Sequence, residues 1–240
     1  MRRIAAVARR ELGSYFNSPV AYIVIVFFLV FTSAWFFFVG QFFARDTATL
    51  RGYFSVWPLA FIILLPALTM RSWAEEYRLG TAEILLTLPF RERELVLGKF
   101  TAALALLGLL AVLSLPVALL VAPLGSFEPG QIAGQYLGVL LLGAAGLAAG
   151  LFFSALSANQ ISAFLFGVVF LLFITLIGQV PSLLALPLWL ARLLSWLSFD
   201  YHFDSFSKGL LDTRDAVYFL VLIAWFLLLT TRVLLLRRFR

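Results

Sequence analysis

Long uncharged stretches alternate with short charged segments along the whole chain. A helix needs about 20 mainly apolar residues to cross the hydrocarbon core of a bilayer, so each stretch predicts a spanning helix. The uncharged run 129–191 is too long for one helix, and a polar break at Ser157, Asn159 and Gln160 divides it. Six spans are therefore expected, near residues 20–43, 54–70, 100–123, 131–156, 161–180 and 216–236.

Composition strengthens this interpretation. Only 12% of the residues are charged and 63% are hydrophobic, whereas a soluble domain carries about 25% charged residues. The excess apolar surface requires lipid. We expect an all-α integral membrane protein with one transmembrane domain over residues 1–240. The net charge of +6 is explained by basic residues at helix ends, so no nucleic-acid partner is expected.

The basic residues predict an orientation. With the N-terminus inside, 13 of the 18 Lys and Arg residues fall in inner segments and 5 in outer ones. Because cytoplasmic loops carry the excess of Lys and Arg, both termini are expected in the cytoplasm. An even number of spans agrees with this.

The N-terminal segment, residues 1–18, is expected to be an interfacial helix rather than a span. Its apolar residues recur at helical spacing while four arginines fall elsewhere, which is typical of a basic amphipathic helix on the inner membrane surface. Pro19 would then turn the chain into the membrane.

The segment 71–99 is the most charged part of the chain, with five basic and five acidic residues. Gly80 interrupts it, and Thr81 is expected to cap a new short helix with Glu83 in its first turn. Pro89 would end that helix. A capped, charged helix that also carries Leu and Ile suits docking to a cytoplasmic partner better than a solvated linker.

The segment 181–215 is expected on the outer side of the membrane. Its tryptophans, Trp189 and Trp196, favour the headgroup level, which predicts an interfacial or re-entrant helix. His202 follows. It could belong to a metal or proton site, or it could tie the re-entrant piece to the last span, and the second interpretation is favoured. Neither a metal site nor catalytic residues are expected.

Glycines cluster in the fourth span, with GxxxG spacings at Gly134–Gly138 and Gly146–Gly150. Such spacings let helices approach closely. Packing within the protomer is favoured over a dimer seam.

Ionisable residues are missing from the middle of the spans, which argues against a proton-driven secondary transporter. No phosphate-cradling P-loop motif occurs, and no Ser–His nucleophile pair is credible. An enzyme is therefore not expected. The chain itself should bind no cofactor.

The stretch from Glu75 to Pro89, followed by Gly98-Lys99, resembles the signature of the ABC type-2 permease family. That resemblance implies a coupling helix between the second and third spans, seated in a groove of a separate ATPase. The residues that would carry the coupling are Glu75, Glu76, Tyr77, Arg78, Gly80, Thr81 and Glu83.

Two more stretches resemble the branch that contains gliding-motility-associated (GldF-like) and NosY-like permeases. One is the inner turn with Asn159 and Gln160. The other is the outer segment 201–219, and the residues with a structural role there would be His202, Phe206, Gly209, Asp212 and Asp215.

The resemblance implies half of an ABC transporter, expected to be an exporter, in a bacterial inner membrane. A cytoplasmic ABC ATPase would hold ATP and Mg²⁺, a second or related permease copy would pair with this chain, and a periplasmic or outer accessory protein would join them. The cargo would be apolar or amphipathic. Two alternatives stay open: a mechanical assembly or signalling module driven by such an ATPase, and a membrane enzyme acting on lipid.

Overall fold

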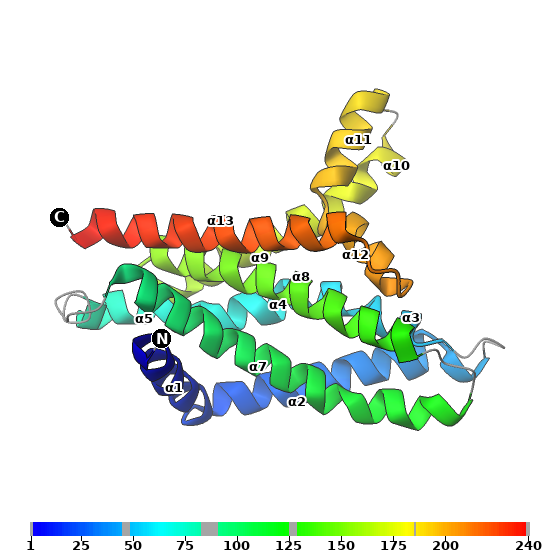
Figure 1. Cartoon of the computed structure of the whole chain (residues 1–240), viewed down its shortest axis with the longest axis horizontal. Coiled ribbons are helices and arrows are strands. Elements are labelled where there is room, and N and C mark those ends of the chain that lie inside the picture. The colour runs from blue at the N-terminus through cyan, green and yellow to red at the C-terminus, as the bar shows by residue number, and fades with distance from the viewer. Residues whose placement is uncertain (1, 45–48, 83–90, 125–128, 185, 239–240) are drawn as a thin grey trace.

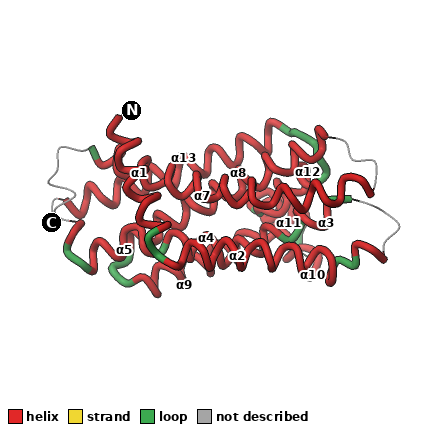
Figure 2. Tube along the Cα trace, turned by 90° about the horizontal axis from the view of Figure 1, so that it is seen from below, coloured by secondary structure: helices red, strands yellow, loops and turns green. Residues whose placement is uncertain are grey.

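Every element in the described part of the chain is a helix, and the long helices run side by side (Figures 1 and 2). The computed structural model describes residues 2–44, 49–82, 91–124, 129–184 and 186–238. Within these ranges six helical runs are long and apolar enough to cross a membrane, which confirms a multi-pass, all-α membrane protein. They extend over Ala21–Val39, Arg51–Arg78, Glu92–Val121, Pro129–Leu156, Gln160–Leu183 and Thr213–Arg237.

Three of the spans consist of more than one helix. The first is α2 (Pro19–Ala34) with a π-helical turn, Trp35–Val39; the second joins α3 (Arg51–Phe54), α4 (Trp57–Thr69) and α5 (Arg71–Arg78); the fifth joins α9 (Gln160–Leu176), a 3-10 turn (Ile177–Gln179) and α10 (Val180–Leu183). The other three are α7 (Glu92–Val121), α8 (Pro129–Leu156) and α13 (Thr213–Arg238). Outside the spans lie α1 (Arg2–Phe16), α11 (Leu188–Leu197) and α12 (Phe199–Ser207), and short 3-10 turns occur at Phe42–Ala44 and Ala122–Leu124.

The second and fourth spans form the interior of the bundle. In each of them 72% of the apolar window is buried, against 22–39% in the other four. Helix α8 packs against α4, α7, α9, α12 and α13. The outer spans α2, α9 and α13 instead expose large apolar side chains, as lipid-facing helices do.

Glycines let neighbouring elements approach α8 closely. A Cβ atom on Gly138 would lie 2.3 Å from the Cβ atom of Phe206, and one on Gly146 would lie 2.4 Å from a methyl group of Leu65. The atoms that fill these spaces belong to the same chain. This confirms the prediction that the glycines serve packing within the protomer.

The inner turn between the fourth and fifth spans is also as expected. Asn159 is the N-cap of α9, and its side-chain oxygen accepts a hydrogen bond of 2.9 Å from the backbone N–H of Ile161. Gln160 is the first residue of that helix. The polar break in the long uncharged run therefore ends one helix and begins the next.

Both termini of the described chain lie at one end of the bundle, together with α5 (Figure 1). We call this the terminal end and the other the distal end. Helix α1 packs against α7, and the contact is close because a Cβ atom on Gly98 would lie 2.5 Å from Val7. The expected amphipathic N-terminal helix is present, and which side of the membrane it faces stays a prediction.

Helices α10 and α11 project sideways from the distal half of the bundle (Figure 1). No residue of α11 is buried, and Leu188 and Trp189 are 77% and 69% exposed. The segment expected to be interfacial or re-entrant therefore forms an apolar arm beside the bundle. An arm that runs across the spans suits an interfacial position, and its entry into the bilayer stays a prediction.

Candidate functional site

The terminal end carries the residues that the sequence singles out for contact with a partner. Glu75, Glu76, Tyr77 and Arg78 lie on α5, which continues the second span instead of leaving it at Met70 as expected. The reason is a hydroxyl from α8: Ser154 Oγ accepts from the backbone N–H groups of Trp73 and Ala74, at 3.0 and 3.2 Å, and donates to the Met70 carbonyl at 3.0 Å. It satisfies backbone groups that the break after α4 leaves open.

Gly80 ends α5 in the left-handed region, with φ of +70°, which is a conformation that glycine adopts without steric cost. Thr81 then donates from its hydroxyl to the carbonyl of Glu76 at 3.4 Å. Capping the next helix would need the hydroxyl to accept from a backbone N–H, so this contact differs from the expected one. The remaining predicted residue, Glu83, lies outside the described residues.

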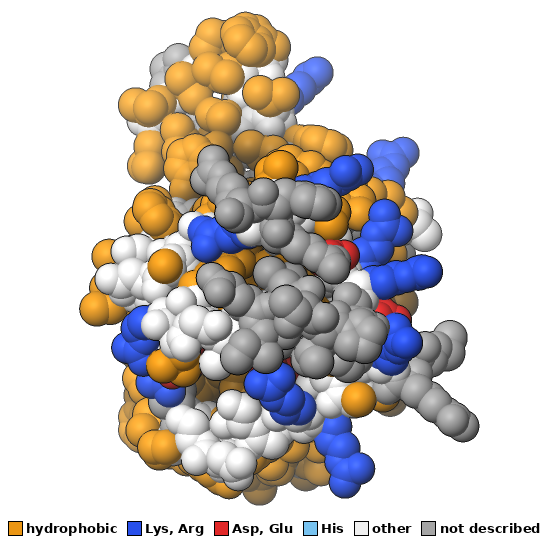
Figure 3. Space-filling model, turned by 90° about the vertical axis from the view of Figure 1, so that its left-hand side faces the viewer, with side chains coloured by type: hydrophobic (Ala, Val, Ile, Leu, Met, Phe, Trp, Pro, Cys, Tyr) orange, Lys and Arg blue, Asp and Glu red, His pale blue; other side chains and the backbone are white. Residues whose placement is uncertain are grey.

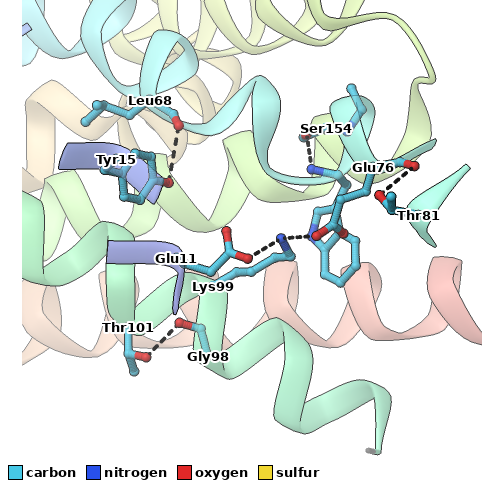
Figure 4. Close-up of polar contacts among 11 residues, drawn as sticks. Glu11, Tyr15, Leu68, Glu76, Thr81, Gly98, Lys99, Thr101 and Ser154 are labelled. Atoms are coloured by element: carbon cyan, nitrogen blue, oxygen red, sulfur yellow. Dashed lines mark hydrogen bonds and ion pairs between the residues drawn. The ribbon is translucent and has the colours of Figure 1, made fainter. Parts of the chain in front are cut away.

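Glu76 is buried, and this corrects one expectation. Sequence reasoning places it among the groups that meet the ATPase. Instead its Oε1 atom lies 2.9 Å from Lys99 Nζ, and that ammonium also lies 3.0 Å from Glu11 Oε1 (Figure 4). The Lys99 side chain is only 2% exposed, and it lies 4.8 Å from the Trp73 ring centroid.

This buried cluster joins three elements that are far apart in the sequence. Glu11 belongs to α1, Glu76 to α5 and Lys99 to α7. A buried charge without a partner is costly, because the protein interior solvates a charge less well than water does. The three side chains therefore hold one another in place. The second carboxylate oxygen of Glu76 has no hydrogen-bond partner among the described residues.

The other predicted residues of α5 are accessible or join α5 to the C-terminal helix. Glu75 and Arg78 form a loose ion pair of 3.7 Å, and the Arg78 side chain is 60% exposed. Tyr77 lies with its ring 4.2 Å from the guanidinium of Arg237, which donates to the carbonyl of Leu156 at 2.7 Å. The surface of this end is rich in Lys and Arg (Figure 3).

Sequence reasoning missed the roles of Lys99 and Glu11. A signal was present: Glu11 is the only acidic residue in the first 19 positions, and Lys99 is the last charged residue before an uncharged run of 28. A lone acid in a basic amphipathic helix and a lone cation at the start of a span are natural partners.

The distal end contains a second buried ionisable pair. His202 of α12 has its Nδ1 atom 2.7 Å from Asp215 Oδ1 of α13, and its Nε2 atom 2.8 Å from the carbonyl of Trp196 in α11. The side chain of His202 is 3% exposed. The favoured prediction that His202 ties the outer segment to the last span is thus confirmed. The described residues contain no group of three His, Cys, Asp or Glu side chains that could hold a metal ion.

The other predicted residues of the distal end have packing and capping roles. Phe206 is fully buried against Gly138, and Gly209 adopts a φ of +77° beside Gln131. The Oδ1 atom of Asp212 accepts a hydrogen bond of 2.9 Å from the backbone N–H of Arg214 at the start of α13.

A small polar cavity of about 270 Å³ lies beside these residues, between α3 and α12. Burial and the neighbouring carboxylate of Asp204 raise the pKa of Asp200. Burial would also raise the pKa of Asp204, but the ammonium of Lys208 and the guanidinium of Arg51, 3.0 Å away, outweigh it and lower that pKa. Arg51 thereby joins α3 to α12.

Comparisons of the chain with protein-family models and with curated proteins find no match. The terminal end and the distal end therefore have to be interpreted from their own geometry.

Proposed function

We propose that this chain is the transmembrane permease subunit of an ATP-driven ABC exporter. A separate cytoplasmic ATPase binds ATP and Mg²⁺. The chain lies in a bacterial inner membrane, with its terminal end facing the cytoplasm. Two permease copies, identical or related, form the transport unit. The chain is not itself an enzyme. Its cargo is apolar or amphipathic, and an accessory protein on the outer side completes the pathway.

The observation that carries the proposal is the way α5 is built into the bundle. It presents the exposed Arg78, its partly buried partner Glu75 and the turn at Gly80 at the terminal end. At the same time it continues α4, which belongs to the buried second span and packs against α8 of the equally buried fourth span. A helix with one end accessible and the other in the core suits the transmission of a push from a partner.

The connections of α5 would spread such a push. Ser154 links it to α8, and Lys99 links it to α7 and α1. A displacement at Gly80 would therefore reach four elements together. Two-state transitions in proteins commonly act through packed helices that move as units.

Glu76 is not a suitable residue with which to test coupling, because its substitution would remove a partner of the buried Lys99 ammonium. Arg78→Glu is the better variant, since its side chain is exposed and its only ion pair in the described residues is the loose contact with Glu75. Arg214→Glu at the distal end makes the same charge change at an exposed position and serves as the control.

The experiment uses the full chain in lipid nanodiscs with the ATPase encoded by a neighbouring gene. We expect the two to co-elute, and the chain to change the rate of ATP hydrolysis. Arg78→Glu should weaken co-elution and reduce this effect on hydrolysis at least fivefold, whereas Arg214→Glu should leave both unchanged. A chain that neither co-elutes with the ATPase nor alters its rate would refute the proposal.

A further inference from the structure

A cavity of about 290 Å³ opens at the terminal end between α1 and the junction of α4 with α5. Two chain features fix its depth in the membrane. Pro19, where α2 begins, follows α1 directly, and Arg71 follows the apolar helix α4. The helical run of the second span continues through α5, but its apolar part ends at Met70. The cavity therefore lies where the apolar parts of two spans end, which is the level of lipid headgroups.

The charges around the cavity do not balance. Arg10, Arg71 and Lys99 line it, together with Glu11, Glu75 and Glu76. Glu75 is paired with Arg78 from outside the lining. With Glu75 paired in this way, the described lining has three cations, Arg10, Arg71 and Lys99, against the two carboxylates of Glu11 and Glu76, and one positive charge is left over. Arg10 and Arg71 are exposed and form no ion pair within the described ranges.

A surplus of one positive charge between two guanidinium groups is suited to one phosphodiester. Guanidinium groups bind phosphate oxygens in a planar, two-pronged geometry, so they are the usual side chains for this task. Ser14 and Ser72 add hydroxyl groups to the lining. Burial raises the pKa of Tyr15 to about 12, so its hydroxyl stays neutral, and it donates to the Leu68 carbonyl at 3.3 Å.

An apolar path leads from the cavity along α4. Ala67 lines the cavity, and Ile63 and Leu59 precede it at intervals of four residues, which places all three on one face of the helix. Ile63 is 56% exposed and Leu59 is 45% exposed. The cavity volume lies at the lower end of the range for ligand pockets, about 300–1,000 Å³, so it suits a headgroup whose acyl chains lie outside.

We propose that this cavity binds an anionic phospholipid. The phosphate lies between Arg10 and Arg71, and an acyl chain follows the face of α4 that carries Ile63 and Leu59. The lipid joins the surface helix α1 to the second span beside the Lys99 cluster. The proposal is independent of the transport function, because it rests on the cavity and its charges alone.

The test measures lipid binding to the purified full chain in neutral maltoside detergent. The probes are dioleoyl phosphatidylglycerol, dioleoyl phosphatidylcholine and inorganic phosphate, followed by native mass spectrometry and by thermal unfolding. We expect one phosphatidylglycerol to be retained and to raise the melting temperature. Phosphatidylcholine, which carries no net charge, should bind at least tenfold more weakly, and inorganic phosphate should not displace the anionic lipid.

Two double variants that remove the same amount of positive charge distinguish binding at this site from general electrostatic attraction of the anionic lipid. Arg10→Gln with Arg71→Gln should lower the affinity for phosphatidylglycerol by about tenfold or more, as expected for losing hydrogen bonds between charged groups. Arg9→Gln with Arg91→Gln removes the same charge from exposed positions outside the lining, and should change the affinity less than threefold.

A third variant keeps both guanidinium groups and fills the space. Ala67→Phe should also lower the affinity at least fivefold, and its melting temperature without lipid shows that it is folded. The proposal is overturned if phosphatidylcholine binds equally well, if the Arg9 and Arg91 variant loses as much affinity, or if Ala67→Phe binds normally. Displacement of the lipid by inorganic phosphate would show that the ligand is a free phosphate.

Discussion

The two ends of the bundle are each held by a buried nitrogen-bearing side chain, His202 at the distal end and Lys99 at the terminal end, but the groups around them differ. At the distal end His202 faces one carboxylate, Asp215, and one carbonyl. Each ring nitrogen of His202 therefore has one partner. At the terminal end the single ammonium of Lys99 lies between two carboxyl groups, those of Glu11 and Glu76.

The His202 site is complete in its hydrogen bonds, since each ring nitrogen has one partner. Such a site suits an end that only fixes the arm and the last span. At the terminal end two carboxyl groups share one ammonium, and the same end carries the exposed Arg78 of α5 and the cavity that Arg10 and Arg71 line. The comparison can be tested by replacing Lys99 and His202 in turn.

Lys99→Met should have the largest effect, because it leaves two carboxylates buried without a cation. Breaking a buried ion pair by removing one partner costs about 3–5 kcal/mol. The measurement is thermal and denaturant unfolding of the purified full chain in detergent. Adding Glu11→Gln and Glu76→Gln to Lys99→Met should recover most of the loss. A single variant as stable as the parent would show that the cluster contributes nothing.

His202→Phe should cost less, about 1–3 kcal/mol, because it leaves the single carboxylate of Asp215 unpaired. It also frees α11 from α12, so limited proteolysis within residues 186–198 should become faster. Tyr201→Phe is the matched control, since that neighbouring side chain is 56% exposed. If the arm were cleaved at the same rate in His202→Phe and Tyr201→Phe, His202 would not be the residue that holds the arm to the bundle.

Glycine substitutions on α8 compare packing at the two ends. Gly138→Ala places a Cβ atom against Phe206 next to its backbone and should cost about 1–3 kcal/mol. Gly150→Ala would place its Cβ atom 2.2 Å from the hydroxyl of Thr69, a β-branched side chain bonded to the Leu65 carbonyl, so its cost should be of similar size. Gly108→Ala on α7 is the control, because its Cβ atom would have no atom within 4 Å, and it should stabilise by up to about 1 kcal/mol. Unfolding in detergent measures all three, and a reversed order would contradict the packing argument.

Asp200→Asn should have the smallest effect, and one that depends on pH. The raised pKa of Asp200 means that its charged form is disfavoured in the folded protein. That penalty is fully present above the folded pKa and disappears as the pH falls below the unfolded value, about 3.9. The variant should therefore melt about 2 °C higher at pH 7 and show no gain near pH 3.5. A gain that is constant with pH would exclude this cause.

The spans and their turns could be predicted because their causes are local. A run of uncharged residues, a polar break at Asn159 and glycines at a spacing of four all act within one or two turns of helix. His202 could be connected to the last span because its aspartate partner lies 13 positions away. In each case the residues that explain the structure stand close together in the sequence.

The buried cluster could not be predicted in the same way. Lys99 and Glu11 are 88 positions apart, and they meet only because α1 packs on α7 through Val7 and Gly98. Family resemblance placed Glu76 on the surface, since its motif describes residue types and not the direction of each side chain. The extent of the second span was also missed, because the group that sustains it, Ser154, comes from another helix.

Ser154 has a mechanical consequence for α5. Its hydroxyl oxygen makes three hydrogen bonds to backbone groups on both sides of the break at Met70. Bonds that meet at a single atom fix a distance, but they leave rotation about that atom comparatively free. Helix α5 can therefore change its angle to α4 with little loss of bonding, whereas sliding along α8 breaks every one of these contacts. The single oxygen atom of Ser154 thus permits α5 to tilt but opposes its translation.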